Sequence, residues 1–120
     1  RDSCEAVARS VNRTQHERGR FEALTADMLD FDYADWIGDA SALIINTSCE
    51  HILTFDEWFA SVPEGTAMVL QSNDYFSCDE HVNCVPTLQA FEQQAPLSET
   101  LFSGQLKLKK YTRFMQIGRR

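Results

Sequence analysis

The stretch SALIINTS, residues 41–48, decides the fold of this chain. Its branched aliphatic residues, Leu43 to Ile45, follow one another without the alternation of polar and apolar side chains that marks a strand with one wet face. Such a run is typical of a strand covered on both faces in a parallel sheet. Chemically capable side chains then follow without interruption from Asn46 to His51.

Patterns typical of helices and strands alternate along the rest of the chain. Helical spacing of apolar residues from Cys4, closed by Gly19, predicts a first helix. The stretch RFEALTADML, residues 20–29, predicts a strand of about six residues before Asp27. The remaining predicted elements are one helical turn in residues 30–40, a helix in residues 54–62, a strand in residues 66–72 and a helix between Pro86 and Pro96.

The last twenty residues show a different pattern of apolar and polar side chains. Leu106 to Lys109 and Thr112 to Met115 alternate between apolar and polar side chains, which predicts two antiparallel strands. Strands that alternate with helices predict right-handed crossovers. We therefore expect an α/β fold, Rossmann-like, with a mostly parallel sheet, an antiparallel C-terminal strand pair, and one partial domain over residues 1–120.

Composition limits the function. The chain has 120 residues, is 43% hydrophobic and carries a formal net charge of −7. An acidic chain is a poor ligand for nucleic-acid phosphates, so we expect no nucleic-acid partner. No apolar run is long enough for a membrane span, which predicts a cytoplasmic protein without membrane contact. The chain opens on Arg1 instead of Met, and we expect a longer parent protein.

The order of elements, ending in an antiparallel strand pair, resembles a class I S-adenosylmethionine-dependent methyltransferase, a Rossmann-like fold whose last strand runs against the rest. The resemblance covers the C-terminal two-thirds of that fold. The family's first strand, its glycine-rich loop, its first helix and its second strand have no counterpart in these residues. The resemblance implies S-adenosylmethionine as cofactor and a small-molecule substrate.

The resemblance also implies roles for residues at the strand ends. Asp27 would accept a hydrogen bond from the adenine amino group, with Met28 beside it. The methyl acceptor would be a nitrogen or oxygen atom of a small molecule. Residues 46–49 lack the Asn-or-Asp, Pro, Pro, aromatic motif of methyltransferases that act on nucleobase amines, which argues against a nucleobase acceptor. The other implied contacts are Asn46, Thr47 and Ser48 for the cofactor, Cys49, Asn73 and Asp74 for the substrate, and Glu50, His51 and Tyr75 for catalysis.

Other interpretations remain open. Asp27 could be an ordinary turn residue. Cys78, His81 and Cys84, completed by Cys49 or His51, could form a zinc-stabilised module, although the methyltransferase interpretation assigns no metal. A non-catalytic Rossmann-like module is a further alternative, in which a homodimer or a partner segment covers an open sheet edge.

Overall fold

The computed structural model describes residues 2–39 and 41–120, and side chains from Cys4 onward. Arg1 therefore lies outside the described residues. The chain divides into two compact units, Arg1–Phe31 and Asp32–Arg120.

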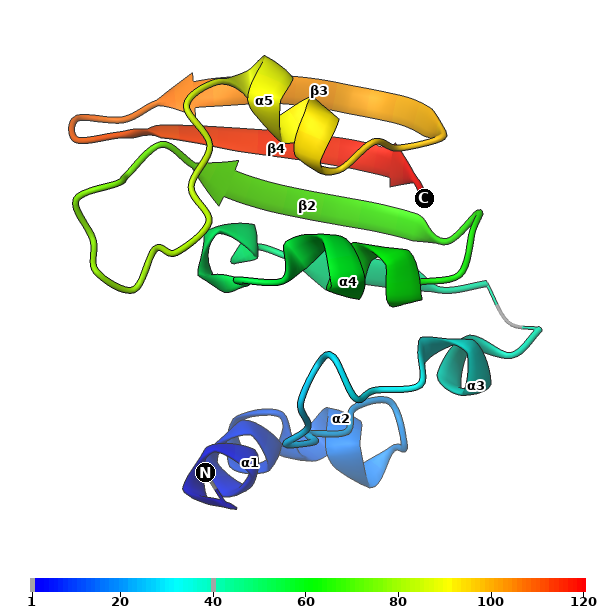
Figure 1. Ribbon diagram of the computed structural model, residues 1–120. Coiled ribbons are helices and arrows are strands. Elements are labelled where there is room, and N and C mark those ends of the chain that lie inside the picture. Colours follow the sequence, from blue (N-terminus) through cyan, green and yellow to red (C-terminus); the bar gives the residue numbers. More distant parts are fainter. Residues whose placement is uncertain (1, 40) are drawn as a thin grey trace. The chain divides into compact units, whose positions relative to one another are not determined.

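The first unit is helical, and the predicted first helix is confirmed in two pieces. These are α1 (Asp2–Val11) and α2 (Arg13–Glu17) (Figure 1). Gly19 follows with a φ of 66°, a left-handed conformation that suits glycine at the end of a helix.

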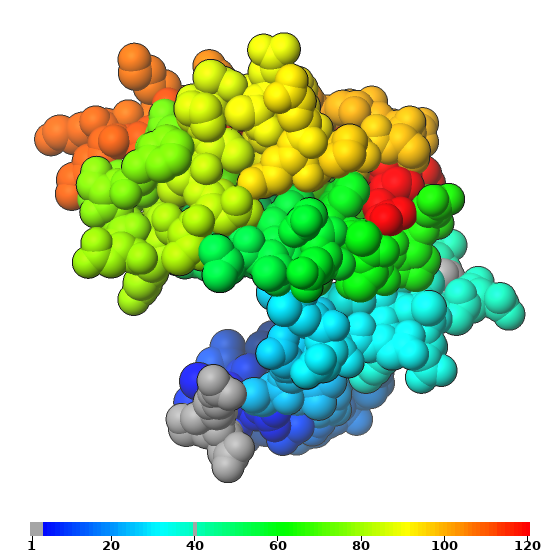
Figure 2. Space-filling view, viewed as in Figure 1, coloured from blue at the N-terminus to red at the C-terminus, as the bar shows by residue number. Residues whose placement is uncertain are grey.

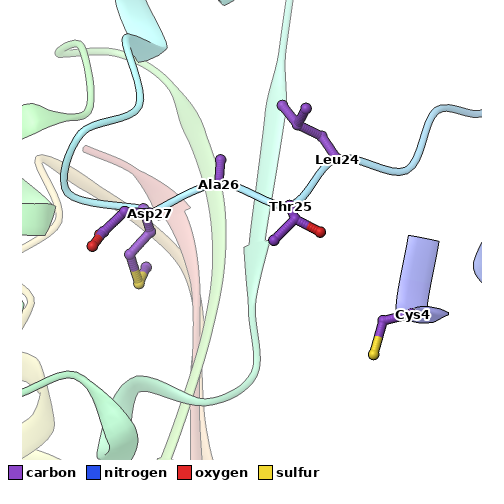
Figure 3. Close-up of a pocket in the computed structure, with 6 residues that line it drawn as sticks. Cys4, Leu24, Thr25, Ala26 and Asp27 are labelled. Atoms are coloured by element: carbon purple, nitrogen blue, oxygen red, sulfur yellow. The ribbon is translucent and has the colours of Figure 1, made fainter. Parts of the chain in front are cut away.

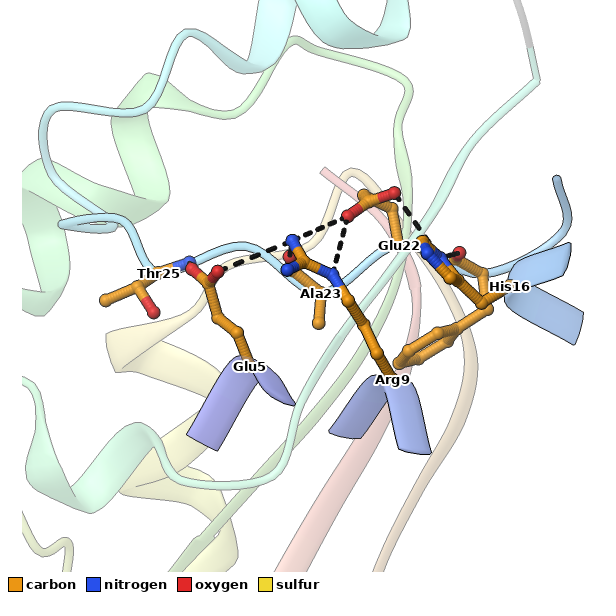
Figure 4. Close-up of polar contacts among 7 residues, drawn as sticks. Glu5, Arg9, His16, Glu22, Ala23 and Thr25 are labelled. Carbon is orange, nitrogen blue, oxygen red and sulfur yellow. Dashed lines mark hydrogen bonds and ion pairs between the residues drawn. The ribbon is translucent and has the colours of Figure 1, made fainter. Parts of the chain in front are cut away.

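The strand predicted before Asp27 is wrong. Residues 21–27 have no regular secondary structure. Side chains of the helices bind the backbone of residues 21–27 instead (Figure 4). Arg9 donates to the carbonyl of Ala23 at 2.9 Å, and the N–H of Thr25 donates to the Glu5 carboxylate. These backbone groups are satisfied locally, so they do not require a neighbouring strand.

The second unit alternates helices and strands as the sequence predicts, including a helical turn after residue 32. Its elements in chain order are α3 (Tyr33–Ile37), β1 (Leu43–Asn46), the 3-10 helix η1 (Cys49–His51), α4 (Phe55–Ser61), β2 (Ala67–Asn73), α5 (Leu88–Gln94), β3 (Glu99–Lys107) and β4 (Thr112–Arg119).

The four strands form one sheet in the order β1-β2-β4-β3. β1 pairs with β2 in parallel, whereas β4 is antiparallel to both β2 and β3. The antiparallel C-terminal strand pair is therefore confirmed. The mostly parallel sheet is wrong, because β4 lies between β2 and β3 and separates two strands that run in the same direction.

The hydrophobic core lies between one face of this sheet and the helices α4 and α5, which both lie in front of it in Figure 1. The space-filling view shows these two helices, together with the yellow-green loop that follows β2, covering most of the sheet behind them (Figure 2). Trp58, Phe91 and Phe114 are among the largest fully buried side chains. Burial of apolar side chains of this size is the main driving force for folding of the unit.

The opposite face of the sheet is partly exposed. Leu43 and Ile45 point to that face and are 56% and 63% exposed. The expectation that β1 is covered on both faces is therefore wrong. Among the described residues, no helix has the length and apolar character needed to cross a membrane.

Candidate functional site

The candidate site is built at the carboxyl ends of β1 and β2. Because these strands are parallel neighbours, the residues that follow them meet at the same sheet edge. The side chain of Asn46 accepts a 3.0 Å hydrogen bond from the N–H of Ser48. This turn leads directly into η1, in which Cys49 and Glu50 are buried.

Glu50 is the central charged group of the site. Its side chain is 3% exposed, an unusual position for a carboxylate. Oε1 accepts a 2.6 Å hydrogen bond from Nδ2 of Asn73, at the end of β2. Oε2 is buried without a hydrogen-bond partner among the described residues. One oxygen of the buried carboxylate is therefore unsatisfied within the described part of the chain.

Asn73 connects Glu50 to the loop that follows β2. Its Oδ1 accepts hydrogen bonds from the N–H of Tyr75 at 3.0 Å and from the thiol of Cys84 at 3.3 Å. The backbone N–H of Asn83 donates to the carbonyl of Glu50 at 2.9 Å. Residues from three parts of the sequence are held together in this way, with few degrees of freedom left to the carboxylate.

Two histidines lie beside the carboxylate. His51 is exposed at the end of η1, and His81 comes from the loop after β2. Their ring centroids are 4.6 Å apart in an edge-to-face arrangement. The sequence places His81 in a possible zinc module that Cys49 or His51 would complete. The structure brings His81 to His51 through the fold of the loop after β2, without Cys78 or Cys84 in the same cluster.

Tyr75 and Asp74 occupy the rim in different ways. Tyr75 stacks on Tyr111 with centroids 5.5 Å apart and meets the edge of His81 at 5.7 Å. Asp74 instead accepts a 2.6 Å hydrogen bond from the N–H of Thr112, which ties the end of β2 to the start of β4. Tyr75 is thus placed beside the histidines, and Asp74 supports the backbone.

Arg113 of β4 is a rim residue that the predicted set of site residues does not include. Its guanidinium donates to the carbonyl of Thr47 at 3.4 Å and to the side chain of Gln71 at 3.2 Å. It also lies 5.7 Å from the ring centroid of Tyr111. A positive charge thus stands next to the loop that the resemblance places under the cofactor.

The cysteines do not gather as the zinc interpretation requires. Burial raises the pKa of Cys49 to about 12, and its thiol donates to the carbonyl of Asn46. Burial is also the main reason why the pKa of Cys84 is raised, and the negative charge of Glu50 raises it further. Among the described residues, the three side chains close enough to share a metal are Glu50, His51 and His81, without Cys78 or Cys84.

Asp27 and Met28 lie in the first unit and line a hollow of about 650 Å³. Figure 3 shows Leu24 to Asp27 along one extended stretch of chain, with Cys4 of α1 beside it. The carboxylate of Asp27 accepts a 2.9 Å hydrogen bond from the N–H of Leu29, as a turn aspartate does. The carboxylate is exposed, and a carboxylate can accept more than one hydrogen bond.

No protein-family model and no curated protein matches this sequence. Among solved structures, the fold is similar to an O-methyltransferase family protein from Burkholderia thailandensis, with a TM-score of 0.49 and 17% identity over 92% of this chain and 40% of that one. It is also similar to the N-methyltransferase NodS from Bradyrhizobium japonicum WM9, solved in complex with S-adenosyl-L-homocysteine, with a TM-score of 0.46 and 12% identity over 92% of this chain and 62% of that one. The chain spans less than two thirds of either protein.

Proposed function

We propose that this chain is the carboxyl-terminal part of an S-adenosylmethionine-dependent methyltransferase, acting on a nitrogen or oxygen atom of a small molecule. The observation that carries the proposal is the sheet, in which β1, β2 and β3 run in one direction and the last strand runs against them. This is the feature on which the resemblance to class I methyltransferases depends.

The polar cluster at the ends of β1 and β2 supplies the groups that the reaction needs. In methyl transfer the acceptor atom attacks the methyl carbon in line, the carbon–sulfur bond breaks, and its electron pair stays on sulfur. The acceptor also loses a proton. His51 is exposed at this edge and would receive that proton, while Glu50 and Tyr75 would orient the acceptor. The thiol of Cys49 is fully buried and already donates to the carbonyl of Asn46, whereas Glu50 has one oxygen without a partner among the described residues, so we assign Cys49 no contact with the acceptor.

The cofactor contacts in the proposal are those that the resemblance implies. Asp27 and Met28 would hold the adenine ring, through the exposed carboxylate and the wall of the hollow in the first unit. Thr47 and Ser48 would lie beneath the methionine part of the cofactor. Asn46 holds the turn that presents them.

Calorimetric titration of S-adenosylhomocysteine into the chain tests the proposal. We expect binding that Asp27→Ala weakens by about 1–3 kcal/mol, the cost of leaving a buried hydrogen-bond partner unpaired. Asp30→Ala is the matched control, because this exposed aspartate belongs to the same turn but lies outside the hollow. Equal weakening by the two substitutions, or no binding to the unchanged chain, would argue against methyl transfer.

A second candidate function is a non-catalytic module that pairs with another chain through β1. The observation in its favour is the exposure of Leu43 and Ile45 on a strand at the end of the described sheet. Ile45→Lys should then shift a dimer to a monomer in light scattering, since charge on an edge strand opposes pairing. Leu53→Lys is the control, because Leu53 is 76% exposed and lies outside the strands. A monomer at all concentrations would exclude pairing between two copies of this chain through β1.

A further inference from the structure

We propose that Glu50, His51 and His81 bind a divalent transition-metal ion of the Zn²⁺ type. One ligand atom from each side chain lies within 4.8 Å of the other two. Metal–ligand bonds of about 2.0–2.2 Å place ligand atoms within about 4.4 Å of one another. A small inward movement of the three side chains would therefore complete the site. The proposal departs from the sequence prediction, which assigned no metal.

Both histidines are oriented as metal ligands usually are. Nδ1 of His51 lies 2.9 Å from the carbonyl oxygen of Glu80, and Nδ1 of His81 lies 3.0 Å from that of Tyr75. A carbonyl oxygen only accepts, so Nδ1 must carry the hydrogen in each ring. The neutral ring then has its lone pair on Nε2. Hydrogen bonds from the second ring nitrogen to backbone carbonyls are the usual support of metal-binding histidines.

The carboxylate of Glu50 supplies independent support. It is 3% exposed, and its Oε2 has no hydrogen-bond partner among the described residues. A buried carboxylate oxygen without a partner is costly, because it has lost water and gained nothing in exchange. Neither histidine donates to this oxygen in the structure, so a simple Glu–His hydrogen bond does not satisfy it. A cation bound between the three side chains would satisfy this oxygen.

The donor set indicates the class of metal. Two imidazoles and one carboxylate are typical of catalytic Zn²⁺ sites and of non-haem Fe²⁺ sites, and both types keep positions open for water or substrate. His51 is exposed, so open positions here would face solvent. If the proposed methyl transfer holds, an oxygen atom of the acceptor would occupy one of them. His51 would then be a metal ligand and not the base, and the acceptor's proton would pass to water, because a bound divalent ion lowers the pKa of a coordinated hydroxyl group.

Titration with Co²⁺, whose visible absorption reports its ligands, tests the site in the complete chain after removal of metals with a chelator. We expect one Co²⁺ per chain, with Zn²⁺ competing for the same site. His51→Ala and His81→Ala should each weaken binding at least about tenfold, since loss of supporting groups alone costs that much. His16→Ala is the matched control: Nδ1 of His16 lies 3.0 Å from the carbonyl oxygen of Phe21, but His16 is outside the cluster.

A second measurement avoids substitutions, in case a variant does not fold. The chain has three histidines, so their ring signals in nuclear magnetic resonance spectra are few and assignable. Co²⁺ should broaden the signals of His51 and His81 and leave those of His16 unchanged. Equal broadening of all three, or no Co²⁺ binding, would overturn the metal site. Titration of S-adenosylhomocysteine into the metal-free chain reports separately on the proposed methyl transfer.

Discussion

Nδ2 of Asn73 donates a 2.6 Å hydrogen bond to Oε1 of Glu50, and this bond joins the end of β2 to the buried turn that follows β1. The two residues are 23 positions apart in the sequence. The bond satisfies one oxygen of a carboxylate that water cannot reach, so it positions the group on which the candidate site is built.

Asn73→Ala should therefore lower the free energy of unfolding by about 1–3 kcal/mol, because both oxygens of Glu50 would then lack a partner. Urea denaturation followed by circular dichroism measures the change. Gln105→Ala is the control, since Gln105 is exposed on β3. If both variants unfold at the same urea concentration, the bond contributes nothing measurable.

The fully buried thiol of Cys49 makes stability depend on alkaline pH. Burial raises the pKa of Cys49 from 9.0 to about 12, so the unfolded chain loses this proton first. Below pH 9 the thiol is protonated in both the folded and the unfolded chain, so it does not make the free energy of unfolding depend on pH. Between pH 9 and 12, it should lower the free energy of unfolding by about 1.4 kcal/mol per pH unit.

Urea denaturation at a series of pH values, with reductant present, measures this effect as a difference between the unchanged chain and Cys49→Ala. The variant should lose less stability over the alkaline range. Parallel pH profiles for the two proteins would contradict the prediction. The same burial should protect Cys49 from thiol reagents in the folded chain, whereas the exposed Cys4 should react.

Gly118 allows the close approach of β3 to β4. A Cβ atom at this position would lie 2.0 Å from the carbonyl oxygen of Glu99, which is backbone and cannot rotate away. Gly118→Ala should therefore lower the free energy of unfolding by about 1–3 kcal/mol, the usual cost of overpacking.

Gly104→Ala is the matched control for this prediction. A Cβ there meets the ring of Phe102 at 2.7 Å, and this ring is half-exposed and able to move. Thermal unfolding of the two variants should give a clearly lower midpoint for Gly118→Ala. Similar midpoints would show that the strands separate easily at residue 118.

Gln116 completes the hydrogen bonds at the end of α5. Its buried Nε2 donates to the carbonyls of Phe91 at 3.1 Å and Ala95 at 3.3 Å. The Phe91 carbonyl also accepts from the N–H of Ala95, whereas Ala95 is the residue after α5, where a helix leaves carbonyls without internal partners. Gln116→Leu keeps a similar volume but removes the donor. We expect faster amide hydrogen exchange in Leu88–Gln94 and a loss of about 1–3 kcal/mol in the free energy of unfolding. Exchange that is unchanged in α5 would refute this role.

Local sequence patterns predicted most elements of the second unit. The helix at Phe55–Ser61, the strand at Ala67–Asn73 and the C-terminal strand pair follow from apolar periodicity and from the prolines and glycines that end them. The polar residues after Ile45 also indicated a site at the end of β1. The helices and strands depend on residues close together in the sequence, so the sequence alone determined them.

The tertiary structure decided what depends on distant residues. Residues 21–27 read as a strand, but an extended segment becomes a strand only where a neighbour pairs with it, and Glu5 and Arg9 bind this backbone instead. The place of β4 between β2 and β3 is likewise a choice among pairings that periodicity does not distinguish. His81 joins Glu50 and His51 only because the loop after β2 folds back over η1, through hydrogen bonds that no sequence spacing encodes.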